Sequence, residues 1–172
     1  MHLLALSGSL RAASLNTMAL RALQKLAPES VAIRLYESIG ALPHFNTDVE
    51  MSALPEIVAE LRRQVAAVDG VVIACPEYAH GIPGSFKNAL DWLVGMPDFP
   101  GKPVMLINTS PRSTHAQAAL REVLATMSAR LVHEADVAIE LRNRSADEPE
   151  IVEALRVGLQ AFVRACTEPR AF

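Results

Sequence analysis

Short apolar segments recur along the chain and alternate with longer segments in which apolar residues return at helical intervals. The apolar segments are bounded by Gly, Pro or Ser, and most contain few polar residues, with none at all in residues 71–75. This pattern is typical of strands buried on both faces of a parallel sheet. We predict strands over residues 2–7, 31–36, 71–75, 103–108 and 131–139.

Helical spacing is clear where Ile57, Leu61, Val65 and Val68 fall on one side of a helix. We predict helices over residues 14–27, 52–68, 85–94, 115–129 and 149–165. Strict alternation of strands and helices predicts one α/β domain over residues 1–172, with a doubly wound parallel sheet and right-handed crossovers. For a five-stranded sheet we expect the flavodoxin-like order 2-1-3-4-5.

Composition narrows the possible classes of protein. The 172 residues are 51% hydrophobic and 20% charged, which excludes a disordered chain, and a net charge of −3 indicates neither nucleic acid nor an anionic membrane as partner. No apolar run is long enough to cross a membrane and the N-terminus lacks a basic export region, so we expect a cytoplasmic protein. Cys75 and Cys166 lie far apart, which predicts two reduced thiols and no metal cluster.

The loops after the first, third and fourth strands are the candidate sites, because ligands of doubly wound sheets bind at the carboxyl ends of the strands. The first loop, residues 7–17, offers the hydroxyls of Ser9 and Ser14, the cation of Arg11 and the amide of Asn16. A helix follows, and its free N–H groups and dipole favour an anion, so this loop predicts phosphate binding. The structural alternative is that Ser14 only caps the helix.

Several named motifs are absent from the sequence. There is no G-x-x-x-x-G-K-[ST], and Gly8, which lets the chain turn sharply, is the only glycine of the first loop. The sequence therefore has neither a P-loop nor a G-x-G-x-x-G dinucleotide fingerprint. No acidic residues cluster at this strand end, as a phosphoacceptor domain needs, and no arginine follows Cys75 at the spacing of a C-x₅-R phosphatase loop.

The second loop is rich in residues that shape the backbone. Pro76 and Pro83 fix backbone angles, while Gly81 and Gly84 allow a flat object to approach closely. Such a loop suits the rim of a planar ring system, although a rigid connection that orients the next helix explains the same residues.

The remaining loop residues leave alternatives open. Taken alone, Glu77 and Lys87 are interpreted as solvated charges, and His80 has no neighbouring Cys or His that would indicate a metal site. In the third loop, residues 108–117, polar atoms that could face a ligand come from Asn108, Thr109, Ser110 and Arg112. Ser113 or Thr114 could equally serve only as a helix cap. A hydrolase is disfavoured because G-x-S-x-G is missing.

Two segments together resemble a known family. "GSLRAASLN" at residues 8–16, followed by "PEYAHGIPGSFKNALDWL" at residues 76–93, is similar to the NADPH-dependent FMN reductases, which include chromate, quinone and azo-compound reductases of flavodoxin-like fold. The similarity extends over residues 2–130. It is the pairing of the two motifs that makes the resemblance specific.

The resemblance implies a set of FMN-binding residues. For the phosphate it implies Ser9, Leu10, Arg11, Ser14, Leu15 and Asn16. For the isoalloxazine ring it implies Pro76, Glu77, Tyr78 and Ala79, with Ser110 completing the ring pocket. Ala79 stands where many members have Asn, and the third loop lacks the glycines common in the family.

The resemblance also implies an activity. A hydride passes from NADPH or NADH through FMN to a small acceptor (a quinone, free flavin, chromate, or an azo or nitro compound), with no catalytic side chain required. It further implies a homodimer or homotetramer, for which the helix carrying Leu90, Trp92 and Leu93 is either a contact surface or part of the core. The alternatives are a flavodoxin-type electron carrier, which binds FMN without oxidising NAD(P)H, and a flavin-free interaction domain. The modest net charge and the G-S-L-R loop disfavour the carrier.

Overall fold

The computed structural model of the protein describes residues 1–168. Its strands are β1 (His2–Ser7), β2 (Ala32–Tyr36), β3 (Gly70–Ala74), β4 (Pro103–Asn108), β5 (Arg130–Leu131) and β6 (Val137–Ala138). Its α-helices are α1 (Leu15–Leu26), α2 (Thr47–Ser52), α3 (Glu56–Ala66), α4 (Gly84–Val94), α5 (Thr114–Thr126) and α6 (Pro149–Thr167). Short 3-10 helices span Ile39–Ala41 and His133–Ala135.

The strands form a parallel sheet in the order β2-β1-β3-β4-β5, and β6 pairs with β4 beyond the end of β5. In the central strands Leu4 lies beside Val71, and Val72 lies beside Met105. This order confirms the predicted flavodoxin-like topology. Strand β2 is added on one side of β1, whereas β3, β4 and β5 follow on the other side. This switch in the order of the strands lies between β1 and β3, which is where a ligand crevice is expected.

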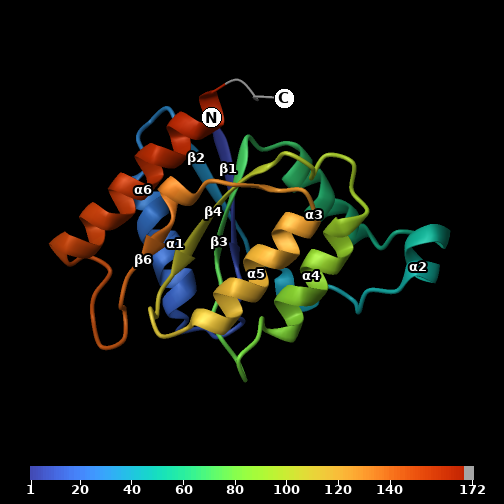
Figure 1. The fold of residues 1–172 in the computed structure, drawn as a ribbon. Helices are drawn as coiled ribbons and strands as arrows, with labels where there is room; N and C mark the ends of the chain where they lie inside the picture. The colour runs from blue at the N-terminus through green and yellow to red at the C-terminus, as the bar shows by residue number, and fades with distance from the viewer. Residues whose placement is uncertain (169–172) are drawn as a thin grey trace.

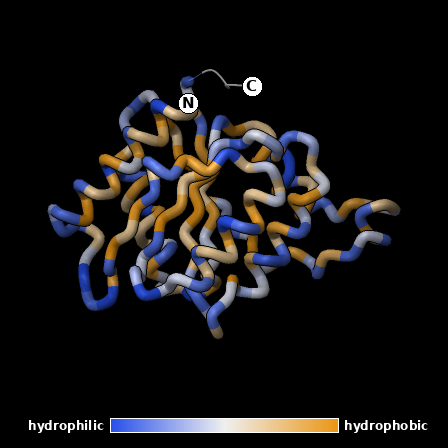
Figure 2. Tube along the Cα trace, viewed as in Figure 1, coloured by the Kyte–Doolittle hydropathy of each residue, from blue (hydrophilic) through white to orange (hydrophobic). Residues whose placement is uncertain are grey.

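Helices cover both faces of the sheet, with α1 and α6 on one face and α3, α4 and α5 on the other (Figure 1). Because successive side chains of a strand point to opposite faces, Leu3 packs with the α1 and α6 side and Leu4 with the α3 and α4 side. Figure 2 shows apolar residues along the central strands. Burial on both faces explains why these segments carry so few polar residues.

The predicted strand over residues 131–139 is wrong as a single element. The structure has β5 and β6 instead, separated by the 3-10 helix His133–Ala135. The carboxylate of Asp136 accepts a hydrogen bond from the backbone N–H of Leu106 at 3.0 Å, so a side chain replaces the strand at this point of the ladder. The other carboxylate oxygen of Asp136 pairs with Arg121 at 2.8 Å. Backbone pairing resumes at Ile107 and Val137.

The predicted helix over residues 52–68 is shorter in the structure. Helix α3 begins at Glu56 because Pro55 occupies its N-cap position and the residue before a proline avoids helical angles. The short helix α2 was not predicted, and it begins where the Asn46 side chain accepts from the N–H of Asp48 at 2.8 Å. The other four predicted helices are confirmed to within a few residues.

Helix α4 contributes its apolar side to the core rather than to the surface. Leu90, Trp92 and Leu93 are all buried within the chain, which decides between the two interpretations of this helix. The indole N–H of Trp92 donates to the carbonyl of Pro43 at 2.8 Å, and the ring of Phe45 packs edge-on against the indole at 5.0 Å. None of the helices within residues 1–168 has the length and hydrophobicity needed to span a lipid bilayer.

Candidate functional site

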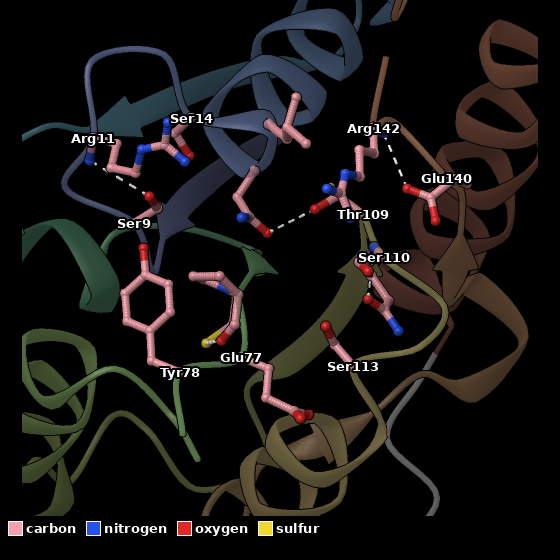
Figure 3. A pocket seen from close by; sticks show the side chains of 15 residues that line it. Ser9, Arg11, Ser14, Glu77, Tyr78, Thr109, Ser110, Ser113, Glu140 and Arg142 are labelled. Carbon is pink, nitrogen blue, oxygen red and sulfur yellow. Dashed lines mark hydrogen bonds between the residues drawn. The ribbon is translucent and has the colours of Figure 1, made fainter. Parts of the chain in front are cut away.

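A cavity of about 510 Å³ opens at the carboxyl ends of the strands, at the predicted crevice. Four loops form its walls, following β1, β3, β4 and β6 (Figure 3). It is lined by Ser9, Arg11, Ser14, Leu15, Asn16, Cys75, Pro76, Glu77, Tyr78, Asn108, Thr109, Ser110, Ser113, Glu140 and Arg142. The topology therefore brings together the three loops that the sequence indicated, and it adds a fourth.

The loop between β1 and α1 presents unpaired donors to the cavity. Ser14 is the N-cap of α1, and its hydroxyl oxygen accepts from the N–H of Thr17 at 3.2 Å, so Ser14 does cap the helix while its hydroxyl hydrogen stays available to a ligand. Within residues 1–168 the N–H groups of Leu15 and Asn16 have no acceptor, and the Arg11 guanidinium has no acidic partner. Together with the helix dipole, these groups form a site suited to an anion.

Gly8 is needed for close packing rather than for a turn. Its φ is not in the left-handed region, contrary to a sharp-turn role. A β-carbon at Gly8 would lie 2.8 Å from Sγ of Cys75 and 3.1 Å from its Cα. The N–H of Gly8 also donates to the carbonyl of Ala74 at 2.8 Å. The ends of β1 and β3 thus meet closely beneath the cavity.

The loop after β3 forms a tight two-residue turn. Tyr78 and Gly81 exchange backbone hydrogen bonds of 3.1 and 3.0 Å, and Ala79 and His80 between them adopt left-handed φ values of 48° and 60°. The turn holds Tyr78 half-exposed on the cavity wall, with its side chain directed towards Ser9 (Figure 3).

Glu77 joins the second loop to the third. Its carboxylate accepts from the backbone N–H of Ala116, in the first turn of α5, at 2.9 Å, so its interpretation as a solvated charge is wrong. Ser113 occupies the N-cap position without a side-chain cap bond and instead lines the cavity. The rings of His80 and His115 stack beside this contact, with centroids 4.3 Å apart. The second and third loops are therefore held together at the rim of the cavity.

Lys87 behaves as an ordinary surface charge and pairs with Asp91 at 2.5 Å.

The loop after β4 is tied to α1. The Thr109 hydroxyl donates to the side-chain carbonyl of Asn16 at 3.1 Å, and both residues are buried. The Asn108 side chain accepts from the N–H of Ser110 at 3.1 Å, which holds Ser110 on the cavity wall. These bonds fix the third wall of the cavity against the first.

Two of the implied residues do not line the cavity. The Leu10 side chain packs towards Gly40, where a β-carbon would meet it at 3.1 Å, and 57% of Leu10 is exposed. Ala79 lies at the tip of its turn. The sequence interpretation missed Glu140, which directly follows the predicted strand 131–139, and Arg142, because residues 142–150 had the composition of a surface loop. The break between β5 and β6, which redirects this segment, was not visible in the apolar pattern.

A family model described as "NADPH-dependent FMN reductase" matches residues 1–143 of the chain. The chain belongs to the NADPH-dependent FMN reductase family. The match spans the loops after β1, β3 and β4 and extends through Glu140 and Arg142 of the fourth wall. The predicted family is thereby confirmed.

Known proteins of this kind resemble the chain over most of its length. The quinone reductase of Escherichia coli is 39% identical over 140 residues, covering 77% of this chain and 74% of the relative. The NAD(P)H-dependent FMN reductase PA1204 of Pseudomonas aeruginosa is 31% identical over 175 residues, covering 94% of each chain. The solved structure of FerB, a flavoenzyme NAD(P)H:(acceptor) oxidoreductase from Paracoccus denitrificans, superposes with a TM-score of 0.77 at 30% identity and covers 96% of each chain.

Membership of the NADPH-dependent FMN reductases defines the class of chemistry. The protein is an oxidoreductase, and its family uses FMN and NAD(P)H. The predicted class of enzyme is confirmed, and the electron-carrier alternative is not favoured.

Cys75 lies on the cavity wall but is chemically unsuited to nucleophilic chemistry. It is buried, and burial raises the pKa of its thiol to about 12. A thiol of that pKa is ionised to only about one part in 10⁴ at pH 8, and the thiolate is the reactive form.

We therefore expect Cys75 to resist alkylation by iodoacetamide in the native protein near pH 8. Half-buried Cys166, whose thiol pKa is raised by burial to about 11, serves as the internal comparison and should react first. Both should react readily in urea, and peptide mass spectrometry separates the two sites. Rapid labelling of native Cys75 ahead of Cys166 would contradict this assignment.

Proposed function

We propose that the protein binds FMN in the cavity and uses it to pass electrons from NAD(P)H to a quinone. The observation that carries the proposal is the set of unpaired N–H groups at the start of α1, flanked by Arg11 and opening onto a cavity that the second and third loops enclose. The quinone is the acceptor named for the Escherichia coli relative. Free flavin, chromate and azo or nitro compounds remain further candidate acceptors.

The residues present fit the phosphate of FMN. The N–H groups of Leu15 and Asn16 lack acceptors, and Arg11 lacks an acid, so each has capacity for phosphate oxygens. The Ser9 oxygen accepts from the N–H of Arg11 and the Ser14 oxygen from that of Thr17, which leaves both hydroxyl hydrogens to donate. We assign the phosphate to these residues.

The second and third loops fit the flavin ring. Pro76 and Tyr78 form one wall of the cavity and Ser110 belongs to the opposite loop. Bound FMN would supply the redox chemistry, taking a hydride from NAD(P)H and delivering electrons to the acceptor. The chain's own part is to hold the ring: the Glu77–Ala116 bond and the Thr109–Asn16 bond keep the surrounding loops in fixed positions before any ligand binds. We assign no nucleophile, since Cys75 stays protonated.

The phosphate assignment is tested with Arg11→Ala. We expect FMN affinity to fall by about 1.5–3 kcal/mol, the scale of a hydrogen bond to a charged group, which is roughly ten- to hundredfold in Kd. Calorimetric titration of the flavin-free protein measures the change. Arg21→Ala is the matched control, because Arg21 is on α1 but pairs with Glu37 outside the cavity. Equal FMN affinity in folded Arg11→Ala and wild type would refute the assignment.

Activity separates the proposed enzyme from an electron carrier. Steady-state oxidation of NADPH or NADH in the presence of a quinone should be rapid and should depend on FMN. A protein that binds FMN yet oxidises neither nucleotide would be a carrier instead.

We also propose a cytoplasmic homodimer or homotetramer, as the family resemblance implies. Light scattering on the purified FMN-loaded protein measures the assembly, and a monomer at micromolar concentration would contradict it.

A further inference from the structure

Among the charged side chains that line the cavity, the two acids have hydrogen-bond or ion-pair partners and the two arginines have no acidic partner in the described part of the chain. Glu77 is held by the N–H of Ala116. One carboxylate oxygen of Glu140 accepts from the backbone N–H of Arg142 at 3.0 Å, and the other lies 3.7 Å from the guanidinium of Arg112. Both acids are thus engaged, whereas the two arginines that line the cavity, Arg11 and Arg142, have no acidic partner within residues 1–168.

Arg142 differs in this respect from its neighbours. Arg144, two residues along the same loop, forms ion pairs with Glu148 and Glu150. Arg112, on the loop after β4, faces Glu140. Arg142 instead extends its guanidinium onto the cavity wall without a counter-ion. An exposed arginine without an acid is common, but one that lines the same cavity as a second unpaired arginine supplies free positive charge at a defined place.

The position of Arg142 brings that charge towards the anion site on α1. Arg142 and Thr109 line the same cavity, and Figure 3 shows the Arg142 side chain reaching in from the loop after β6. The Thr109 hydroxyl in turn donates to Asn16, one of the α1 residues whose backbone N–H has no acceptor. Arg11 belongs to the loop after β1 and Arg142 to the loop after β6, so the two guanidinium groups approach the cavity from different walls.

We propose that Arg142 is a second phosphate-binding residue of this cavity, in addition to Arg11, and that its partner is a phosphate monoester. A phosphate monoester carries a charge of about −1.5 to −2 near pH 7, which two guanidinium groups balance and one does not. The planar guanidinium can also donate two parallel hydrogen bonds to phosphate oxygens. The inference rests on the proposed function, since a ligand of that function brings the phosphate: the 5′-phosphate of FMN or the 2′-phosphate of NADPH.

The test compares ligands that differ only by the phosphate. Flavin-free wild type, Arg142→Ala and Arg142→Lys are titrated calorimetrically with FMN and with riboflavin, and the FMN-loaded forms are assayed for kcat/KM with NADPH and with NADH. Arg164→Ala is the matched control, because it removes the same charge from an exposed position of α6 outside the cavity.

We expect Arg142→Ala to lose about five- to twentyfold in one phosphate-dependent ratio, less than for a buried contact because the side chain is solvated. A lower FMN-to-riboflavin affinity ratio identifies the flavin phosphate as the partner, and a lower NADPH-to-NADH ratio identifies the 2′-phosphate. Arg142→Lys should retain most of the ratio that Arg142→Ala loses, because the charge remains.

The inference is overturned if both ratios in Arg142→Ala equal those of Arg164→Ala, which includes the case in which the affinities for both members of each ligand pair fall equally. Circular dichroism of the variants verifies that the fold is retained. Failure of the proposed function looks different, since wild type itself would then bind FMN no more tightly than riboflavin.

Discussion

Gly8→Ala is expected to destabilise the protein by about 2–3 kcal/mol, within the range for inserting a methyl group into a packed interior. The new β-carbon would lie 2.8 Å from Sγ of Cys75 and 3.1 Å from both its Cα and Cδ of Pro76. Even if the Cys75 thiol changes rotamer, the other two contacts cannot rotate away, because one is backbone and the other is a proline ring. Urea unfolding followed by circular dichroism measures the loss, and FMN affinity should fall with it because Cys75 and Pro76 line the cavity.

A double-mutant cycle separates the clash from other effects of the substitution. Cys75→Ala removes the sulfur, so Gly8→Ala should cost less in that background, with a coupling energy of about 1 kcal/mol. Gly84→Ala is the control, because a β-carbon at Gly84 meets nothing within 4 Å at the start of α4. That change should be neutral or slightly stabilising. A Gly8→Ala protein as stable as Gly84→Ala would refute the close-packing role.

Gly158→Ala is the second substitution with a large expected effect. Gly158 lies within α6, where alanine is ordinarily favoured by about 1 kcal/mol. Here a β-carbon would lie 2.4 Å from Cγ2 of Val137, 2.9 Å from the carbonyl oxygen of Ala135 and 3.0 Å from Cε of Met105. The overlap with a backbone carbonyl should outweigh the helix propensity, giving a net loss of about 2 kcal/mol.

The expected result has a local signature. The new methyl group would push α6 away from Ala135 and from Val137 of β6. In the Gly158→Ala background, Val137→Ala should therefore recover part of the lost stability, because it removes Cγ2. Val157→Ala, one residue earlier on a half-exposed side of the helix, should change stability by no more than about 0.5 kcal/mol. Urea denaturation of wild type, Gly158→Ala, Val137→Ala and the double variant provides the cycle, and Val157→Ala is measured beside them. A stabilised Gly158→Ala would show that α6 does not pack as closely as described.

The sequence predicted the sheet well because its strands are buried on both faces. Segments such as residues 71–75 then contain no polar residue, and the strand order follows from regular alternation with helices. That Ser9, Arg11 and Ser14 line the cavity was predictable for a different reason, since a polar loop at the carboxyl end of a parallel strand has only one edge of the sheet to occupy.

The missed features depend on side-chain contacts between distant segments. Asp136 replaces part of a strand by bonding to the N–H of Leu106, 30 positions away in the chain. The Glu77 carboxylate accepts a hydrogen bond from the N–H of Ala116 in the first turn of α5, 39 positions away, and no local sequence pattern predicts this contact. In the sequence, Arg142 does not differ from other arginines of polar loops, and only the folded chain places it on the cavity wall. The spacing of apolar residues indicates which face of a helix or strand is buried, but it does not indicate which polar side chain forms a hydrogen bond with which backbone group.

Trp92 gives the protein an internal optical reporter. It is the single tryptophan of the sequence, and its indole is fully buried, bonded to the Pro43 carbonyl and held against Phe45. All tryptophan emission of the protein comes from this one indole, so loss of the core around α4 can be followed by tryptophan fluorescence. Because indole emission overlaps the absorption of oxidised flavin, flavin bound at the strand ends would quench that signal by resonance energy transfer, and the same residue that anchors α4 would then report occupancy of the cavity.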